Sequence, residues 1–135
     1  IANFVVFDAL LLCQEAWVDA ADDRNEEALE KIRTAPGPAT DPLADAVIPQ
    51  LPSTALTVGA MALARIDSGA RAAEAARVLA AADHRLPVGH VSSGVERRGR
   101  GITEARIREA LDEESYERAY AEGGGLSLVE ATALV

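Results

Sequence analysis

The sequence predicts an all-α protein built from antiparallel helical hairpins, and three observations carry that prediction. Nearly half of the 135 residues are hydrophobic, yet only five are aromatic. Apolar residues recur at helical spacing in several windows, and no window alternates with a period of two for long enough to indicate a strand. Alanine and leucine dominate the apolar set. We therefore expect closely packed helices with small side chains between them.

The N-terminal part of the chain predicts one helical pair. The first helix should run over about residues 4–21, because apolar residues recur there at helical spacing, and the second over about residues 25–34. Five prolines then follow in quick succession. Because proline interrupts helices and strands, residues 36–53 are expected to form a loop, with one turn at about 43–47.

The remaining helices are separated by glycine, proline and aspartate. A second helical pair is expected over about residues 54–66 and 70–84, with a turn at 67–69. Residues 87–101 contain four glycines, several arginines and no apolar period, and are expected to form a loop. Three more helices should complete the chain, over about residues 103–111, 112–122 and 127–134.

The last two of these helices carry the clearest local signals. Asp112 can accept hydrogen bonds from the free N–H groups of the turn that follows it. Ser127 followed by Glu130 has the spacing of a capping box. Between these helices, residues 123–125 are three glycines, which can supply the positive φ that a helix end often needs.

Composition also limits the functional classes. One domain is expected over residues 1–135, and because the chain opens without methionine we expect a fragment of a larger protein. The net charge of −9 opposes contact with nucleic acid or an anionic membrane. No stretch is long and apolar enough to span a bilayer. The single cysteine, Cys13, suits a reducing compartment, so a cytoplasmic location is expected.

No set of residues predicts catalysis or metal binding. His84 and His90 are too far apart to bind a metal from successive helical turns, and no second cysteine or paired carboxylate accompanies them. Cys13 lies in an apolar run and is expected to be a buried, inert thiol. Neither a nucleophile elbow nor a phosphate-binding loop occurs. We expect no enzyme activity and no cofactor.

The two N-terminal helical pairs have related spacing. Ala28 and Ala72 occupy corresponding places, 44 positions apart; the usual tetratricopeptide repeat is about 34 residues, and the proline-rich loop accounts for the excess. Glu15 and Asp19 depart from that motif, because it normally places large apolar side chains there. The chain is predicted to be a degenerate tetratricopeptide-like array of about six to seven helices, with an irregular helical bundle as the alternative.

Two segments of the C-terminal half carry a resemblance to a known family. Residues 71–83 form an alanine- and arginine-rich helix, and residues 111–131 combine an acidic helix start, tyrosines, Ala-Glu-Gly and Leu-Ser-Leu-Val-Glu-Ala. They resemble the C-terminal tetratricopeptide-like domain of actinobacterial transcriptional regulators of the bacterial-transcriptional-activator-domain and ATPase-type LuxR families. Asp112 replaces the family's usual glycine, and Tyr120 its tryptophan or arginine. Between Pro87 and Ile102, where the family starts a long helix, this chain has glycine and arginine.

In those regulators, nucleotide hydrolysis and DNA binding belong to other domains. The resemblance therefore implies a non-enzymatic interaction or effector-sensing module. Its expected partners are neighbouring domains, another protein or a small effector, with no direct contact to nucleic acid. Candidate partner-binding residues are the possible groove anchors Trp17, Tyr116 and Tyr120, and the basic residues Arg97, Arg98 and Arg100.

Two other functional classes remain open from the residues alone. One is a nucleic-acid-binding helical domain that uses the basic cluster from Arg97 to Arg108. The other is a small helical ligand-binding or enzyme domain built around His84 and His90.

Overall fold

The computed structural model describes residues 2–34 and 48–135, and every regular element in these ranges is helical. The all-α prediction is confirmed. The expected turn at 43–47 and most of the proline-rich loop lie outside the described residues. The elements are α1 (Ala2–Ala21), α2 (Asn25–Thr34), α4 (Leu51–Leu63), the short 3-10 helix η2 (Ile66–Gly69), α5 (Ala72–His84), α6 (Gly94–Ala110), α7 (Glu113–Gly123) and α8 (Leu128–Leu134).

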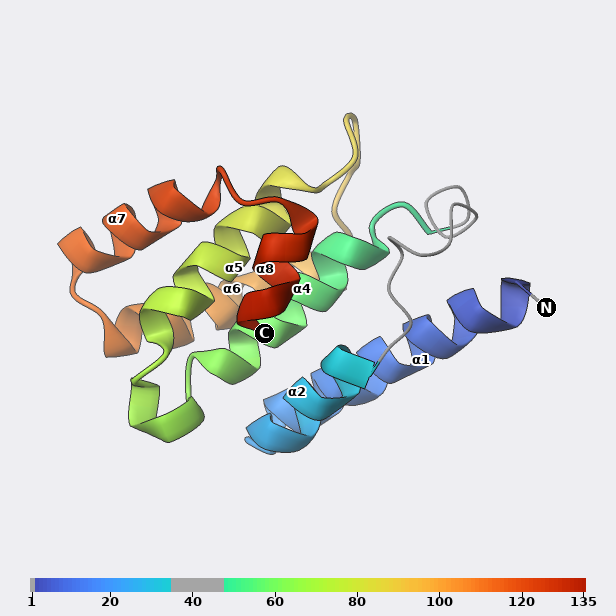
Figure 1. Cartoon of the computed structure of the whole chain (residues 1–135), viewed down its shortest axis with the longest axis horizontal. Coiled ribbons are helices and arrows are strands. Elements are labelled where there is room, and N and C mark those ends of the chain that lie inside the picture. Colours follow the sequence, from blue (N-terminus) through green and yellow to red (C-terminus); the bar gives the residue numbers. More distant parts are fainter. Residues whose placement is uncertain (1, 35–47) are drawn as a thin grey trace.

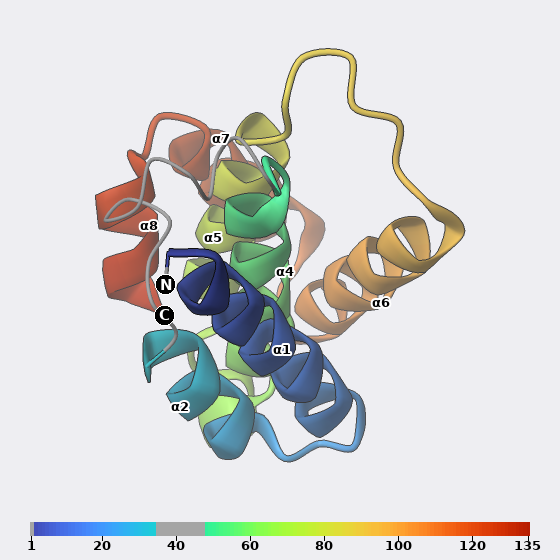
Figure 2. The same cartoon turned by 90° about the vertical axis from the view of Figure 1, so that its right-hand side faces the viewer.

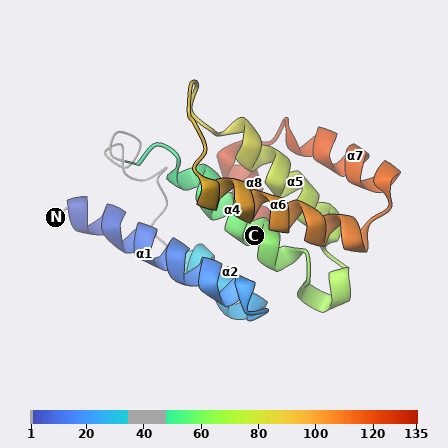
Figure 3. The same ribbon diagram turned by 180° about the vertical axis from the view of Figure 1, so that it is seen from behind.

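Helices α4 and α5 form the centre of the molecule and pack along each other. Helices α1 and α2 pack together against α4, on the side away from α7 (Figure 1). Figure 2 shows α1 in front, with α6 to its right. Helix α6 crosses both α4 and α5, as the view from behind shows (Figure 3). Helices α7 and α8 cover the remaining surface of α5.

Small side chains fill the space between α4 and α5. Ala60 on α4 and Ala76 on α5 have no exposed surface, and the larger Met61 and Leu79 beside them are also fully buried. Alanine lets two helix backbones approach closely, so many weak dispersion contacts form over a small area. This confirms the alanine-lined packing that the composition predicts.

The pair α1–α2 contains a buried charge, at a position where the repeat motif would place an apolar side chain. The Asp19 side chain is only 5% exposed, and its carboxylate lies 2.5 Å from Nζ of Lys31 and 2.8 Å from Nη2 of Arg24. A buried carboxylate is tolerated when such partners replace water. The charge of Asp19 is therefore compensated by Arg24 and by Lys31, the only lysine in the chain.

Helix α4 begins earlier than the sequence predicts. Its first residue is Leu51, so the expected loop over 36–53 is wrong for its last three residues. Pro52 lies in the first turn, where a missing N–H costs nothing because no intrahelical acceptor is available there. The predicted turn at 67–69 is found within η2, where Asp67 and Ser68 both adopt left-handed φ values of 50° and 58°.

The expected loop over 87–101 is wrong from residue 94 onward, because α6 already begins at Gly94. The Ser93 side chain accepts a hydrogen bond from the backbone N–H of Glu96, which caps the helix. Apart from Arg106, the buried face of α6 is made of small or medium-sized residues at helical spacing: Gly99, Thr103 and Ile107. Such a face has little apolar signal, so the helix is hard to recognise from hydrophobic periodicity.

The two C-terminal caps are confirmed. Asp112 accepts a hydrogen bond from Ser115 N–H at 2.8 Å, and Ser127 and Glu130 form the complete capping box. The expected role of the glycines at 123–125 is wrong, because none of the three has a positive φ. Gly123 is instead the last residue of α7 and lies against the backbone of Arg77 on α5, where a side chain would collide.

Candidate functional site

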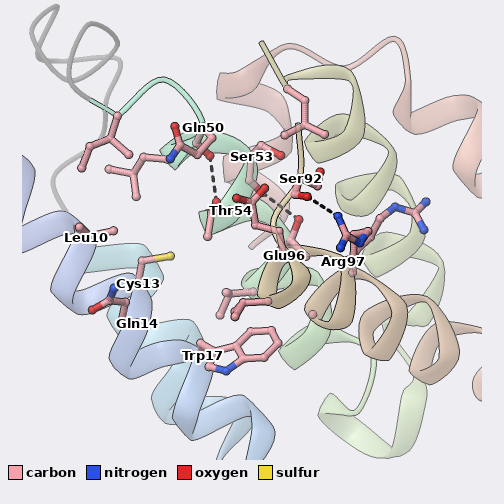
Figure 4. A pocket seen from close by; sticks show the side chains of 18 of the residues that line it. Leu10, Cys13, Gln14, Trp17, Gln50, Ser53, Thr54, Ser92, Glu96 and Arg97 are labelled. Carbon is pink, nitrogen blue, oxygen red and sulfur yellow. Dashed lines mark hydrogen bonds between the residues drawn. The ribbon is translucent and has the colours of Figure 1, made fainter. Parts of the chain in front are cut away.

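A groove with a volume of about 400 Å³ opens between α1, α4 and the N-terminal part of α6. Figure 4 shows α1 forming one wall and α4 and α6 the opposite side, with the lining side chains between them. The volume lies within the range of small-molecule sites, which is roughly 300–1,000 Å³. The groove is the candidate site in the described part of the chain.

Helix α1 supplies an apolar wall. Leu10, Cys13 and Trp17 line the groove, and Val18 lies at its rim with 52% of its surface exposed. Apolar residues occupy a wide part of the circumference of α1, and α2 and α4 cover only some of it. The uncovered apolar side chains of α1 therefore face the groove. The indole of Trp17 packs against Gly99 of α6, so α1 and α6 meet at that point of the groove.

Helix α4 contributes three hydroxyl groups next to apolar side chains. The Ser53 hydroxyl donates to the carbonyl of Ala82 at 2.8 Å, that of Thr54 to Gln50 at 3.0 Å, and that of Thr57 to the carbonyl of Ser53 at 2.9 Å. Each donor is therefore used within the protein. The hydroxyl oxygens keep lone pairs that can accept a further hydrogen bond.

Three of the four charged residues around the groove are paired. Arg100 holds Asp83 through Nε at 3.0 Å from Oδ1 and through Nη2 at 2.7 Å from Oδ2. Hydrogen bonding to Asp83 raises the pKa of Arg100 above its ordinary value. Glu96 lies 2.7 Å from Nε2 of His90. Arg97 donates to the carbonyl of Ser92 and is exposed at the rim.

The structure brings three of the six predicted site residues to this groove: Trp17, Arg97 and Arg100. Arg98 is exposed and does not line it. Sequence reasoning missed the contribution of α4, in particular Thr54 and Thr57. Nothing in a single sequence marks these threonines, because their role depends on which helices α4 packs against.

Tyr116 and Tyr120 lie on α7, outside the groove, with ring centroids 5.9 Å apart. Tyr116 is 4% exposed, donates to Glu104 at 3.1 Å and lies beneath the guanidinium of Arg108. The Tyr120 hydroxyl donates to Oδ2 of Asp83 at 2.5 Å. Burial raises the pKa of both tyrosines, that of Tyr116 to about 12. Both residues fasten α7 to α5 and α6, so their expected role as groove anchors has no support in this arrangement.

The basic cluster does not form one continuous surface. Arg106 is buried and donates to the carbonyl of Ala20 at 2.9 Å, and desolvation lowers its pKa. Arg108 pairs with Glu113. Arg100 is also paired and Arg97 donates to the carbonyl of Ser92, so four of the five arginines from Arg97 to Arg108 make contacts within the fold. Arg97 and Arg98 are exposed, so the cluster is divided between surface positions and positions used within the fold.

Cys13 and His84 could serve as a nucleophile, a base or a metal ligand, but neither lies in a setting that indicates such a role. Cys13 is buried, and desolvation raises its thiol pKa to about 12, so it carries little thiolate near neutral pH. His84 lies at the end of α5 and contacts the carbonyl of Ala80 at 2.8 Å. Within residues 2–34 and 48–135, no three histidine, cysteine or acidic side chains gather as they would around a metal ion. The same residues include no helix with the length and apolar character needed to cross a membrane.

The fold and the groove define a class, an all-α chain with a small apolar cleft bordered by paired charges. No protein-family model matches this sequence, and no curated protein or solved structure is similar enough to count as a match.

Proposed function

We propose that this chain is a non-enzymatic helical-repeat interaction module of a multidomain transcriptional regulator, and that the groove between α1, α4 and α6 receives its partner or effector. The assignment to a cytoplasmic regulator of actinobacterial type rests on the resemblance of residues 71–83 and 111–131. The partner is a neighbouring domain, another protein or a small effector.

One observation carries the proposal: the groove lies on α1, α4 and α6. Helix α1 is the first helix of the packed pair α1–α2, and α4 is the first helix of the packed pair α4–α5. In a tetratricopeptide-like array, stacked pairs of this kind create a concave surface that binds ligands. The groove is thus where such an array would bind its partner.

The chemistry of the groove favours binding over catalysis. Its thiol, Cys13, is protonated near neutral pH, because its pKa is raised to about 12. A catalytic nucleophile needs an adjacent base or a lowered pKa. Asp83 and Arg100 satisfy each other, and Glu96 is held by His90, so these groups already have partners within the fold.

The test compares the chain with two variants as immobilised baits in an extract of the source cells. Val95→Glu places a carboxylate at the groove rim, and Val129→Glu places one on α8, away from the groove. The two valines are 69% and 71% exposed, so neither change should disturb the fold. Bound proteins and small molecules are identified by mass spectrometry.

We expect at least one bound protein or small molecule to be retained by the unmodified chain and by Val129→Glu. The same molecule should be absent from the Val95→Glu bait. If the three baits retain the same components, the groove is not the binding site. Turnover of any retained small molecule by the purified chain would contradict the non-enzymatic assignment.

A further inference from the structure

We infer that the occupant of the groove is a neutral, largely apolar small molecule with a flat body and at least one hydrogen-bond donor. This inference rests on the proposed function and names the chemical class of the effector. Four features carry it: the size of the groove, its closure by Trp17, the pairing of its charges, and the hydroxyl oxygens of α4.

The size and shape of the groove favour a small molecule. A volume of about 400 Å³ suits a drug-sized ligand. A partner helix would need a channel open along its length, but Trp17 on α1 packs against Gly99 on α6 and joins the two walls. The indole also offers a flat apolar surface, on which a planar ligand body can stack.

The charges favour a neutral ligand. The carboxylate of Asp83 forms an ion pair with Arg100 at 2.7 Å, and that of Glu96 lies within hydrogen-bond distance of Nε2 of His90, at 2.7 Å. A buried ion without a partner loses its hydration, at a cost that apolar contacts with Leu10 or Trp17 do not repay. Arg97 is exposed, so an anion bound there would stay at the rim and in water.

Two hydroxyl groups of α4 in the groove lining favour a hydrogen-bond donor on the ligand. Thr54 and Thr57 each donate their hydroxyl proton to a backbone carbonyl one turn earlier, at 3.0 Å and 2.9 Å. Their oxygens can then act only as acceptors toward a ligand. A ligand with an N–H or O–H group can donate to these oxygens, whereas one that offers only acceptors gains no hydrogen bond from them.

Two probes with the same aromatic skeleton test the class directly. Phenylnaphthylamine is neutral, planar in part, and carries one N–H donor; anilinonaphthalene sulfonate adds a negative charge. Both brighten in apolar surroundings, and both accept energy from tryptophan. The chain contains one tryptophan, Trp17, which lines the groove, so quenching of its emission reports occupancy.

We expect saturable one-to-one binding of phenylnaphthylamine, with quenching of the Trp17 emission. Anilinonaphthalene sulfonate should bind more weakly, by a factor of about ten or more. Thr57→Phe fills the groove and should abolish binding of the neutral probe. Thr132→Phe is the matched control, since Thr132 is exposed on α8 and donates to a carbonyl one turn earlier in the same way. Helicity by circular dichroism verifies that each variant folds.

If Thr57→Phe does not fold, Val95→Glu replaces it, because the exposed rim tolerates the change and the added charge should weaken the neutral probe. Equal or tighter binding of the sulfonate, binding unchanged by both groove variants, or no binding of phenylnaphthylamine would each overturn the inference. The proposed function would survive those results if Val95→Glu still lost a protein component that the unmodified chain retains.

Discussion

The indole of Trp17 lies so close to Gly99 that a Cβ atom at that position would come within 2.6 Å of Cη2. This contact joins α1 to α6, although nothing in the sequence of either helix indicates that the two helices meet. It also determines how far the two walls of the groove stand apart.

The replacement Gly99→Ala should destabilise the chain by about 1–3 kcal/mol, because the new methyl group overlaps the indole ring. Gly101→Ala, two positions along the same helix, is the control. A Cβ there meets no atom within 4 Å. Since alanine favours the helix, that variant should be more stable by about 0.5–1 kcal/mol. Urea unfolding measures both changes, and similar effects at the two glycines would contradict the Trp17 contact.

Gly123→Ala should lower the free energy of unfolding by about 2–3 kcal/mol, because a Cβ at this position would lie 2.6 Å from the Cα atom of Arg77. Backbone atoms cannot rotate away as a side chain can. Gly125→Ala is the comparison, as its nearest neighbour would be the carbonyl oxygen of Glu122 at 3.8 Å. Thermal unfolding followed by circular dichroism should separate the two. Loss of stability only at Gly125 would show that the packing of α7 on α5 is different.

Asp19→Asn should cost about 1–3 kcal/mol, because it removes the charge from hydrogen bonds to Lys31 and Arg24. Asp22→Asn provides the reference. Its side chain is 67% exposed and only 3.9 Å from Arg24, so its loss should change stability by less than about 0.5 kcal/mol. Chemical unfolding of the two variants at neutral pH tests this difference. Equal costs would mean that the buried pair contributes no more than a surface contact.

The tyrosine at position 116 predicts a loss of stability in alkali. Burial raises its pKa from 10.0 to about 12, so the folded state binds the phenolic proton more tightly than the unfolded state does. The stability that this shift contributes is fully present below the unfolded pKa of 10.0 and is lost as the pH rises toward about 12. Tyr116→Phe should flatten the fall in unfolding free energy over this window. Tyrosinate absorbance in Tyr120→Phe, where Tyr116 is the remaining tyrosine, reports the titration itself, and a midpoint near 10 would contradict the shift.

Local signals in the sequence were reliable where the physical cause is itself local. The caps at Asp112 and Ser127 depend on hydrogen bonds within three residues, and both form as predicted. The turn near Asp67 is also where the chain indicates it. The helix start at Ser93 was missed, although Ser93 and Glu96 have capping spacing, because the glycines and arginines that follow weaken the apolar period.

The candidate site was predictable only in part. Trp17, Arg97 and Arg100 could be singled out as candidates by residue type, and all three line the groove. Tyr116 and Tyr120 were singled out in the same way, yet they hold α7 against Glu104 and Asp83. Residue type suggests what a side chain can do, whereas its surroundings decide whether it lies in a core or in a groove.

By itself, the sequence determined that the chain is all-α, that small side chains fill its centre, and that the last two helices begin at their caps. These properties depend on composition and on neighbours within one turn. Tertiary structure alone decided that Trp17 meets Gly99, that Gly123 fits against Arg77, and that α1, α4 and α6 enclose a groove. Such relationships join residues far apart in the chain, and they arise from the way whole helices pack, which no local pattern encodes.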